Sequence, residues 1–327
     1  MPVTTRLMVT GATGFVGRAV VAAFAHDHIV RAAVRQAPQL PFADDVEIVQ
    51  HPDLSQSFDW TPLLDGVDHV VHLAGIAHTG GDPASYDRVN HEATAELAAA
   101  AARAGVRRLV FVSSLRAQSG PAAERVLTEN DEAKPTNAYG RSKFAAEAAV
   151  KAAGVPFTIL RPVLLYGPGV KGNFAVLMRA ARSPWPLPVK DFTNRRSLLG
   201  TDNFISALRF VLATPATAGE TYIVADPGIP PRLPDVIATL RQAQGRRSLL
   251  VSMPIHYVES ALRLIGRDAL WQRIGGDLRA DPGKLIAAGW QPAHDSNSGL
   301  AALAYGDAGT DLRPRKTMPP ATPTPKM

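Results

Sequence analysis

The segment VTGATGFVG, residues 9–17, decides the fold. It follows the apolar stretch RLMVT at 6–10 and runs into alanine- and valine-rich residues, so its three glycines fall between a strand and a helix. Glycine lets such a turn tighten and lets the backbone approach a pyrophosphate at the positive end of the helix dipole. This context predicts a dinucleotide-binding loop; the alternative is a purely structural turn. The residues expected to line the loop are Gly11, Thr13, Gly14, Phe15, Val16 and Gly17.

The first half of the chain alternates short β-branched runs with alanine-rich stretches. Buried strands are expected at 6–10, 28–34, 46–50, 68–74, 108–114 and 156–162. Helices are expected at 15–26, 84–104 and 137–153. Strands that alternate with helices form right-handed βαβ units, which build a parallel sheet covered on both faces. The pattern therefore predicts an α/β protein with a doubly wound parallel sheet, the Rossmann fold.

The second half of the chain has a different texture. Prolines cluster at 184–188 and 227–234, and the helical stretches become irregular. We expect a Rossmann domain at 1–166 and a smaller, partly interleaved substrate-binding domain at 167–305. Residues 196–200 and 221–226 are expected to return to the sheet. The proline-rich end, 306–327, is predicted to be disordered because it has little apolar surface to bury.

Composition excludes several classes of function. The chain has no cysteine, which rules out disulfides, thiolate catalysis and cysteine-based metal sites, and no metal site is predicted. No apolar run is long enough for a membrane helix and no secretory signal is visible, so we expect a cytoplasmic protein without a membrane partner. The formal charge is +6, but the basic residues are scattered and not interleaved with aromatic residues. Nucleic acid is therefore not an expected partner.

Arg35 bears on the choice of dinucleotide. The acidic residue that usually ends the second strand, and binds the ribose 2′-hydroxyl, is absent; Arg35 stands there instead. An arginine at this position suits the 2′-phosphate of NADP. The pattern slightly favours NADP over NAD, and the alternative is that Arg35 is a solvated strand end.

Tyr139 and Lys143 are four residues apart in NAYGRSKFAAEAAV, residues 137–150. On a helix this spacing places both side chains on one face. A lysine cation beside a phenol stabilises the phenolate and makes tyrosine a general acid or base. Ser114, at the carboxyl end of the predicted fifth strand, is well placed to hold a substrate oxygen near that phenol. The alternative is an ordinary surface pair of an aromatic ring and a lysine.

Together these motifs resemble the extended short-chain dehydrogenase/reductase family, in its branch of nucleotide-sugar epimerases and 4-keto reductases. The resemblance covers about residues 5–305. The motifs that carry it are TGATGFVG (10–17), DL (53–54), HLAG (72–75), VNHEAT (89–94), VSS (112–114), YGRSK (139–143), RPVLLYGPG (161–169) and RRSLLGTDN (195–203).

The resemblance implies a role for each matching residue. Tyr139 is the catalytic acid/base, Lys143 lowers its pKa and binds the nicotinamide ribose, and Ser114 orients the substrate oxygen. The further cofactor contacts it implies are Asp53, Leu54, Leu73, Ala74, Gly75, Asn90 and Pro162. The further substrate contacts it implies, at a diphosphate, are Asn173, Arg196 and Arg273. A homodimer through a two-helix interface that includes residues 137–153 is also implied.

Several of these residues also have a purely structural interpretation. Asp53 and Asn90 are both able to cap a helix, Arg196 is adjacent to Arg195 and suits a solvated pair, and His72 near a strand end is more often structural than catalytic. The sequence also departs from typical sugar epimerases: it reads LRAQSG where a Val-Tyr-Gly follows the serine. Asn203 stands where aspartate is common.

The resemblance thus implies an NAD(P)-dependent enzyme that transfers hydride at a carbon, C4 above all, of a nucleotide-diphosphate sugar. An epimerase returns the hydride to the same carbon from the other face, whereas a 4-keto reductase delivers it once. Two alternatives stay open: an NADPH-dependent reductase of a small non-sugar ketone, and a non-catalytic protein that senses a dinucleotide.

Overall fold

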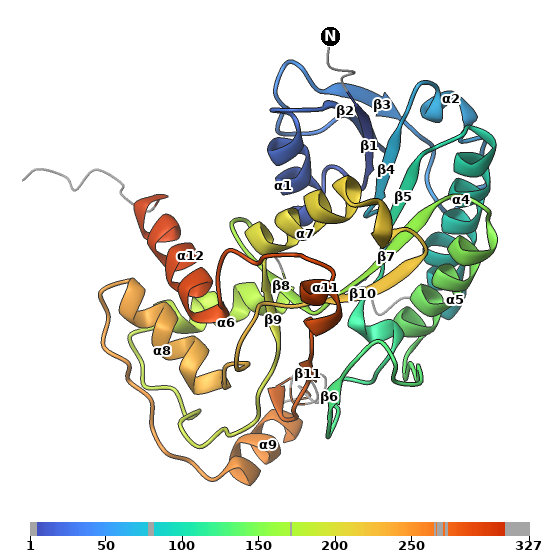
Figure 1. Ribbon diagram of the computed structural model, residues 1–327. Helices are drawn as coiled ribbons and strands as arrows, with labels where there is room; N and C mark the ends of the chain where they lie inside the picture. The colour runs from blue at the N-terminus through green and yellow to red at the C-terminus, as the bar shows by residue number, and fades with distance from the viewer. Residues whose placement is uncertain are drawn as a thin grey trace, which may run out of the picture.

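The computed structural model describes residues 5–77, 82–170, 172–264, 266, 271 and 274–310. Its centre is a seven-stranded sheet in the order β10-β7-β5-β4-β1-β2-β3, with every pair parallel (Figure 1). Its strands are β1 (Arg6–Thr10), β2 (Ile29–Val34), β3 (Glu47–Gln50), β4 (His69–His72), β5 (Arg108–Val112), β7 (Phe157–Pro162) and β10 (Glu220–Val224). The six strands predicted in the first half are thereby confirmed, as is the doubly wound Rossmann fold.

Helices cover both faces of this sheet. In Figure 1, α1 (Phe15–Phe24) and α7 (Thr201–Ala213) lie on one side, while α4 (Ala93–Arg103) and α5 (Ala138–Ala152) lie on the other. Strand β1 shows the alternation that such a sheet needs: Leu7 and Val9 pack with the α1 and α7 side, and Met8 packs with the α4 and α5 side. All three side chains are fully buried. The short helix α2 (Thr61–Leu64) adds Leu63 and Leu64 to the second core.

The predicted helix at 84–104 is continuous but not uniform. It begins as α3 (Pro83–Tyr86), passes through the π-helical turn η1 (Asp87–Glu92) and continues as α4. Asn90 lies in η1, and π turns often occur at functional sites because they re-aim a side chain. The predicted helix at 137–153 is α5, and Asn137 caps it by accepting a hydrogen bond from the Gly140 N–H at 2.8 Å.

Of the two segments expected to return to the sheet, one does and one does not. Residues 221–226 include most of β10, which pairs with β7 at the sheet edge. Residues 196–200 contribute β9 (Leu198–Gly200), which instead pairs with β8 (Leu164–Tyr166) in a separate two-stranded sheet. That expectation was wrong because the β7 edge is already occupied by β10. A second small sheet joins β6 (Val126–Leu127) to β11 (Arg279–Ala280).

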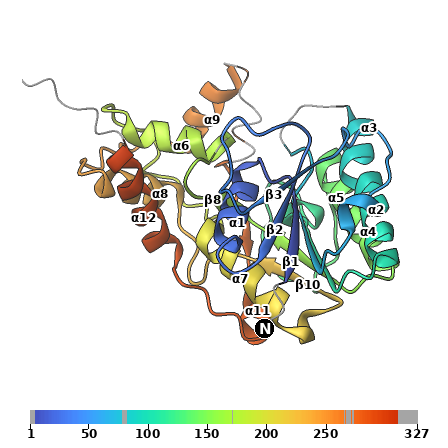
Figure 2. The same cartoon turned by 90° about the horizontal axis from the view of Figure 1, so that it is seen from above.

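Three further helices form a smaller layer with its own hydrophobic core. The helices α6 (Gly172–Arg182), α8 (Leu233–Ala243) and α12 (Ser296–Thr310) lie together at one side of the sheet, away from α4 and α5 (Figures 1 and 2). Their apolar side chains surround Tyr166 and Phe174, whose rings stack at 5.5 Å. The division at residue 167 stays a prediction, since β10 is a strand of the main sheet and α7 packs against one face of it. The described residues also form the helices α9 (Ile255–Leu264) and α11 (Gly283–Ala287) and the short 3₁₀ turns η2 (Leu115–Ala117) and η3 (Pro215–Thr217).

Helix α12 extends to Thr310, five residues into the segment predicted as a disordered tail; residues 311–327 lie outside the described residues. Among the helices described, none is both long and apolar enough to cross a membrane.

Candidate active site

The glycine loop leaves β1 and enters α1 at the carboxyl edge of the sheet. Gly11 has φ +67°, and a Cβ there would lie 2.8 Å from the Ala74 nitrogen. A Cβ on Gly17 would lie 2.1 Å from the Gly11 carbonyl oxygen, so only glycine lets the helix pack this close to the turn. Because positions 11 and 17 are both glycine, the first turn of α1 packs against the glycine loop and the loop after β4. The backbone N–H groups at this end of the helix are available to an anion.

A cavity of about 230 Å³ opens at this edge of the sheet. Its walls come from the ends of β1, β4 and β5 and from the start of α5. The lining residues are Gly11, Gly14, Phe15, Val16, Gly17, Leu73, Gly75, Ile76, Ala77, Val112, Ser113, Tyr139 and Lys143. Tertiary structure thus joins the glycine loop to the Tyr139–Lys143 pair, which are more than a hundred residues apart in the sequence.

Lys143 is buried behind this cavity. Its Nζ donates a hydrogen bond to the Val112 carbonyl at 2.8 Å and lies 4.5 Å from the centre of the Phe111 ring. Burial lowers the pKa of Lys143 to about 8, although Glu147, one turn later on α5, acts to raise it. The ammonium is therefore held at the end of β5 by one carbonyl and one aromatic face.

Tyr139 is partly exposed, but its hydroxyl is shielded from water, and this desolvation raises the pKa of the phenol. Two groups oppose the rise: a hydrogen bond with the Ser114 side chain and the positive charge of Arg116. The direction is opposite to the one expected from the Lys143 cation, because desolvation of the phenol outweighs the groups that favour the phenolate. The Tyr86 ring completes the surroundings at 6.2 Å, edge-on to the Tyr139 ring.

Ser114 is held by its own short turn. Its Oγ accepts a hydrogen bond from the Arg116 backbone N–H at 3.1 Å, which caps η2. The serine is thus fixed beside Tyr139 at the end of β5, where the sequence predicted it.

Asn90 lies beside the cavity, where it joins two of the site's walls. Its Oδ1 accepts from the Ile76 N–H at 2.8 Å, and its Nδ2 donates to the Ile76 carbonyl at 3.0 Å and to Ser142 Oγ at 3.1 Å. The fully buried amide therefore holds the loop after β4 against α5.

His72 is structural. Thr94 donates its hydroxyl proton to the Asn90 carbonyl at 2.7 Å, so His72 Nε2–H donates to Thr94 Oγ1 at 2.9 Å. His72 Nδ1 then accepts from Thr10 Oγ1 at 2.7 Å. Complete burial lowers the pKa of His72 to about 3, so the ring stays neutral.

The other cofactor residues predicted from the sequence fall into two groups. The backbone N–H groups of Leu73 and Ala74 each donate a hydrogen bond to the Thr10 hydroxyl oxygen at 3.2 Å. These two bonds fix the loop after β4. The remaining positions lie outside the lining of the cavity: Thr13 is exposed in the glycine loop, Leu54 is buried in the α4 side of the core, and Pro162 is buried at the end of β7.

Arg35 and Asp53 meet after the ends of β2 and β3. Arg35 Nη1 donates to Asp53 Oδ2 at 2.7 Å, and the other carboxylate oxygen accepts from the Ser55 N–H at 2.9 Å. The bonds from Ser55 and then from Arg35 lower the pKa of Asp53. Asp53 therefore caps a turn rather than a helix, and Arg35 is a partly exposed ion-pair partner rather than a free strand end.

Of the three residues predicted to contact a substrate diphosphate, Asn173, Arg196 and Arg273, the structure describes the side chain of Arg196. Its guanidinium donates to the Gly276 carbonyl at 2.8 Å and to the Pro121 carbonyl at 3.0 Å. Desolvation, together with the nearby charge of Arg116, lowers the pKa of Arg196 to about 10. Arg116 thus lies near both Tyr139 and Arg196, and Arg196 does not form a solvated pair with Arg195. The backbone of Asn173 lies in α6, but its side chain, like the whole of Arg273, lies outside the described residues.

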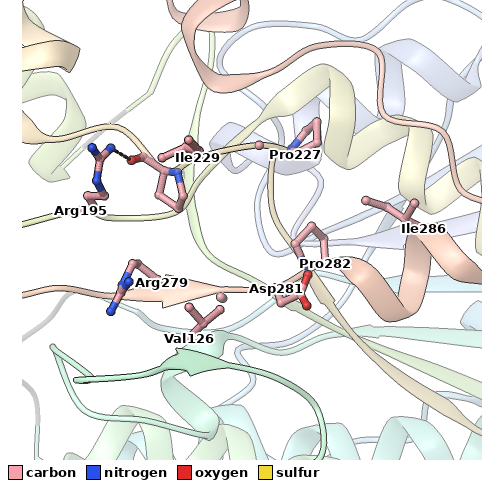
Figure 3. Close-up of a pocket in the computed structure, with 11 residues that line it drawn as sticks. Val126, Arg195, Pro227, Ile229, Arg279, Asp281, Pro282 and Ile286 are labelled. Carbon is pink, nitrogen blue, oxygen red and sulfur yellow. Dashed lines mark hydrogen bonds between the residues drawn. The ribbon is translucent and has the colours of Figure 1, made fainter.

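A larger cavity of about 440 Å³ lies elsewhere, between β6, β11 and the loop after β10 (Figure 3). Arg195 and Arg279 stand at one end of it, and apolar side chains such as Ile229 and Ile286 line the rest. Arg195 Nη1 donates to the Pro230 carbonyl at 2.8 Å, the bond drawn in Figure 3. Because it contains none of the Ser114, Tyr139 and Lys143 side chains, this cavity is separate from the candidate active site.

Comparison with known sequences identifies the family. The sequence model of the NAD dependent epimerase/dehydratase family matches residues 7–225. The chain belongs to this family. It is therefore an enzyme of the extended short-chain dehydrogenase/reductase type, and the cofactor that its glycine loop serves is a nicotinamide dinucleotide.

Two relatives and one solved structure illustrate the similarity. The chain is 31% identical to UDP-glucose 4-epimerase of Vibrio cholerae over 312 residues, which is 91% of this chain and 94% of that protein. It is 27% identical to N-acetyl-alpha-D-glucosaminyl-diphospho-ditrans,octacis-undecaprenol 4-epimerase of Escherichia coli O157:H7 over 80% of this chain and 77% of that protein. The Bordetella bronchiseptica enzyme WbmG in complex with NAD has the same fold, with a TM-score of 0.74 at 21% identity over 94% of this chain and 95% of that one.

The described residues fit the dinucleotide that the family implies. The turn at Gly11 and the close contact at Gly17 leave the α1 N-terminus open toward the cavity, which suits a pyrophosphate. The Arg35–Asp53 pair lies at the ends of β2 and β3, where the adenosine ribose of a dinucleotide rests in this fold.

Six residues at or beside the site were missed by sequence reasoning: Ile76, Ala77, Tyr86, Val112, Ser113 and Arg116. Arg116 follows Ser114 by two residues in LRAQSG, the stretch that departs from typical epimerases, so that departure was itself a signal. Tyr86 precedes the VNHEAT motif by three residues, and its proximity to Tyr139 depends on the packing of α3 against α5.

Proposed function

We propose that the enzyme interconverts hydroxyl and keto groups at C4 of a nucleotide-diphosphate sugar, as a 4-epimerase or a 4-keto reductase. One observation carries this proposal: Tyr139 and Lys143 line the cavity that begins at the glycine loop, and Ser114, just after β5, is hydrogen-bonded to Tyr139. The similarity to a UDP-glucose 4-epimerase over nearly the whole chain supports the choice of substrate class.

In this proposal each side chain has a defined task. Tyr139 Oη accepts the proton of the sugar hydroxyl when the carbon is oxidised and returns it when the carbonyl is reduced. Ser114 Oγ, already hydrogen-bonded to that phenol, holds the same sugar oxygen in place. Lys143 Nζ holds the ribose hydroxyls next to the nicotinamide and contributes positive charge. A bound nicotinamide dinucleotide supplies the hydride acceptor or donor for the carbon.

Arg196 and Arg116 are proposed to hold the anionic part of the substrate. A diphosphate placed between these two cations replaces their mutual repulsion with attraction, which is strong where water is excluded. Asn173 and Arg273 stay proposed contacts of the same diphosphate.

We expect uridine diphosphate to stabilise the enzyme against thermal unfolding, and Arg196→Ala to remove most of that stabilisation. Loss of a charge-assisted contact of this kind costs roughly 1.5–3 kcal/mol of binding free energy. Differential scanning fluorimetry at increasing nucleotide concentration measures the effect. Arg195→Ala is the matched control, because the neighbouring guanidinium points into the separate cavity of Figure 3.

An unchanged response in Arg196→Ala would remove this residue from the site. No response to uridine diphosphate in the wild-type enzyme would instead favour a reductase of a small non-sugar ketone, which has no use for a diphosphate. Among relatives, a ceramide reductase of Caulobacter vibrioides is 36% identical over 63% of this chain and 61% of that protein.

The identity of the retained cofactor separates the two forms of the reaction. The purified enzyme is denatured and the released dinucleotide is identified by mass spectrometry. Tightly held NAD⁺ indicates an epimerase, since internal oxidation and reduction need no cofactor exchange. An empty site that binds NADPH more tightly than NADH indicates a 4-keto reductase.

The Arg35–Asp53 pair is proposed to set the preference between NAD and NADP. Arg35 is able to pair with a 2′-phosphate, but the Asp53 carboxylate occupies it at 2.7 Å and repels a phosphate. We expect Asp53→Asn to shift the ratio of NADPH to NADH affinity toward NADPH by roughly fivefold, since one exposed charge interaction is worth about 1 kcal/mol. Fluorescence titration of both cofactors measures the ratio, with Asp59→Asn as a control at another exposed turn-capping aspartate. A ratio that does not move would assign Arg35 and Asp53 a structural role only.

A homodimer through α5 remains part of the proposal. Phe144 on α5 is 41% exposed, which is unusual for a large aromatic side chain on a helix of the sheet layer. Static light scattering of the wild-type enzyme and of Phe144→Ser tests this contact.

A further inference from the structure

Exposed apolar side chains gather in two segments that lie outside the candidate active site. Among the described residues, fifteen large hydrophobic side chains are exposed, and six of them fall within residues 183–191 and 245–264. We call these six the docking face: Trp185, Leu249, Val251, Met253, Tyr257 and Leu264. Trp185 is 73% exposed and Leu264 is 89% exposed, so these side chains lie on the surface and do not belong to the hydrophobic core.

The two segments are tied together by a fully buried arginine. Arg241 on α8 donates to the carbonyls of Trp185 at 2.8 Å and Leu249 at 2.9 Å. Two backbone hydrogen bonds of Leu187, to Leu249 at 3.0 Å and from Val251 at 2.9 Å, join the same segments as a short ladder. The exposed side chains are therefore presented from a fixed base.

Helix α9 carries two of the six residues of the docking face, Tyr257 and Leu264, and lies at the periphery of the molecule in both views (Figures 1 and 2). None of its residues is buried. One stripe, which includes Ile255, Val258 and Leu262, is half-buried, while Tyr257 and Leu264 stand exposed on another side of the same helix. A helix with apolar residues on its solvent side has surface area left to bury.

The charge around the face is strongly positive. Residues 179–191 and 245–264 carry six basic and two acidic residues, so four of the six net positive charges of the whole chain lie here. The basic residues are Arg179, Arg182, Lys190, Arg246, Arg247 and Arg263, and all of them are exposed. An acidic surface is the electrostatic complement of this region.

We propose that the docking face binds the surface of a bilayer that contains anionic lipids. Exposed tryptophan, tyrosine and leucine side chains on and beside an amphipathic helix insert at the level of the lipid headgroups, while the cations of the flanking segments 179–190 and 246–247 pair with those headgroups. Each such cation contributes about 1 kcal/mol next to an anionic membrane. This is peripheral contact and needs no membrane-spanning helix. The expectation from sequence that the protein has no membrane partner stays a prediction, which the vesicle experiment below tests against this proposal.

The docking face is continuous with one wall of the candidate substrate site. The segment that contains Lys190 leads within six residues to Arg196, and Asn194 donates to the Ile274 carbonyl at 2.7 Å and the Gly276 carbonyl at 3.3 Å. Gly276 also receives the Arg196 guanidinium. A bilayer bound to the docking face therefore contacts the segment that continues to Arg196, the candidate diphosphate contact.

Co-sedimentation of the full-length enzyme with lipid vesicles tests the proposal without reference to turnover. We expect binding to vesicles of equal parts phosphatidylcholine and phosphatidylglycerol, weaker binding to phosphatidylcholine alone, and weakening by added salt. The double variant Tyr257→Ser and Leu264→Ser is expected to lower the affinity on the order of tenfold or more, because two apolar anchors are lost. The matched control, Leu40→Ser with Tyr305→Ser, removes two side chains that are each 66% exposed but lie elsewhere.

Three results would overturn the proposal. Wild-type enzyme that stays in solution with the anionic vesicles excludes the lipid surface as the partner. Equal loss of binding in the docking-face variant and its control shows that the face has no special role. Light scattering that finds a wild-type dimer dissolved by the docking-face variant assigns the face to a second copy of the chain. Circular dichroism of each variant verifies that α9, which buries none of its residues, is still folded.

Discussion

Tyr139→Phe is expected to lower kcat by roughly 10²–10⁴-fold, the usual contribution of a positioned general acid or base. The substitution removes only the phenolic oxygen, and with it the atom that exchanges the substrate proton and bonds to Ser114. The ring that contacts Tyr86 remains, so we expect the thermal unfolding temperature to stay close to that of the wild type. Steady-state kinetics with a nucleotide-diphosphate sugar and a thermal melt measure the two expectations.

The control for this variant is Tyr305→Phe, which removes a phenolic oxygen from an exposed tyrosine of α12. Full activity of Tyr139→Phe would contradict the proposed mechanism, and the proton would then have to pass through another group. If the variant unfolds at a much lower temperature, its loss of activity carries no information, and binding of the dinucleotide to the folded fraction decides whether the cavity is intact.

Glu147→Leu is expected to destabilise the fold by about 3–5 kcal/mol, the range found when one partner of a buried ion pair is removed. Arg161 Nη2 lies 2.6 Å from one Glu147 oxygen, and its Nε lies 2.9 Å from the other, with side-chain exposures of 6% and 1%. Ser113 Oγ donates to the same carboxylate at 2.5 Å. Removal of the carboxylate leaves the guanidinium buried with the Gln118 Oε1 acceptor, at 2.9 Å, as its other side-chain contact. Urea denaturation measures the free energy of unfolding.

A double variant, Glu147→Leu with Arg161→Met, tests the reason for the loss. Because an apolar pair of similar volume requires no desolvation of charge, the double variant is expected to recover much of the stability. A comparison at the exposed Glu259–Arg263 pair of α9 sets the scale: Glu259→Gln is expected to cost about 0.3–0.5 kcal/mol. If the double variant is less stable than Glu147→Leu alone, the uncompensated charge is not the cause.

The pair also matters for the site, because it joins α5, which carries Lys143, to the strands beside it. Glu147 is one turn beyond Lys143 on α5, Ser113 directly follows β5, and Arg161 lies on β7, which pairs with β5. A loss of this pair is expected to disturb the wall behind Lys143 as well as the fold. Neither its burial nor its partners could be predicted, since Glu147 in a helix and Arg161 in a strand look like ordinary surface charges in the sequence.

Local patterns accounted for the sheet and the glycine loop. The strands that form β1, β2, β4, β5 and β7 are short apolar runs, and the turn at Gly11 and Gly17 is specific because only glycine fits there. Residues 196–200 did not join the main sheet because strand pairing depends on tertiary contacts: β10 pairs with β7 at that edge, and β9 pairs with β8.

The sequence by itself determined the doubly wound fold and the order of the motifs that carry the family resemblance, because periodicity, glycine geometry and residue spacing are local properties. Tertiary structure alone decided the electrostatics of the site. It directed Lys143 to the Val112 carbonyl and placed the charge of Arg116 near Tyr139 and Arg196. It also left α9 without a buried residue. Burial and the distance between charges depend on contacts between segments far apart in the chain, and these contacts exist only once the chain has folded.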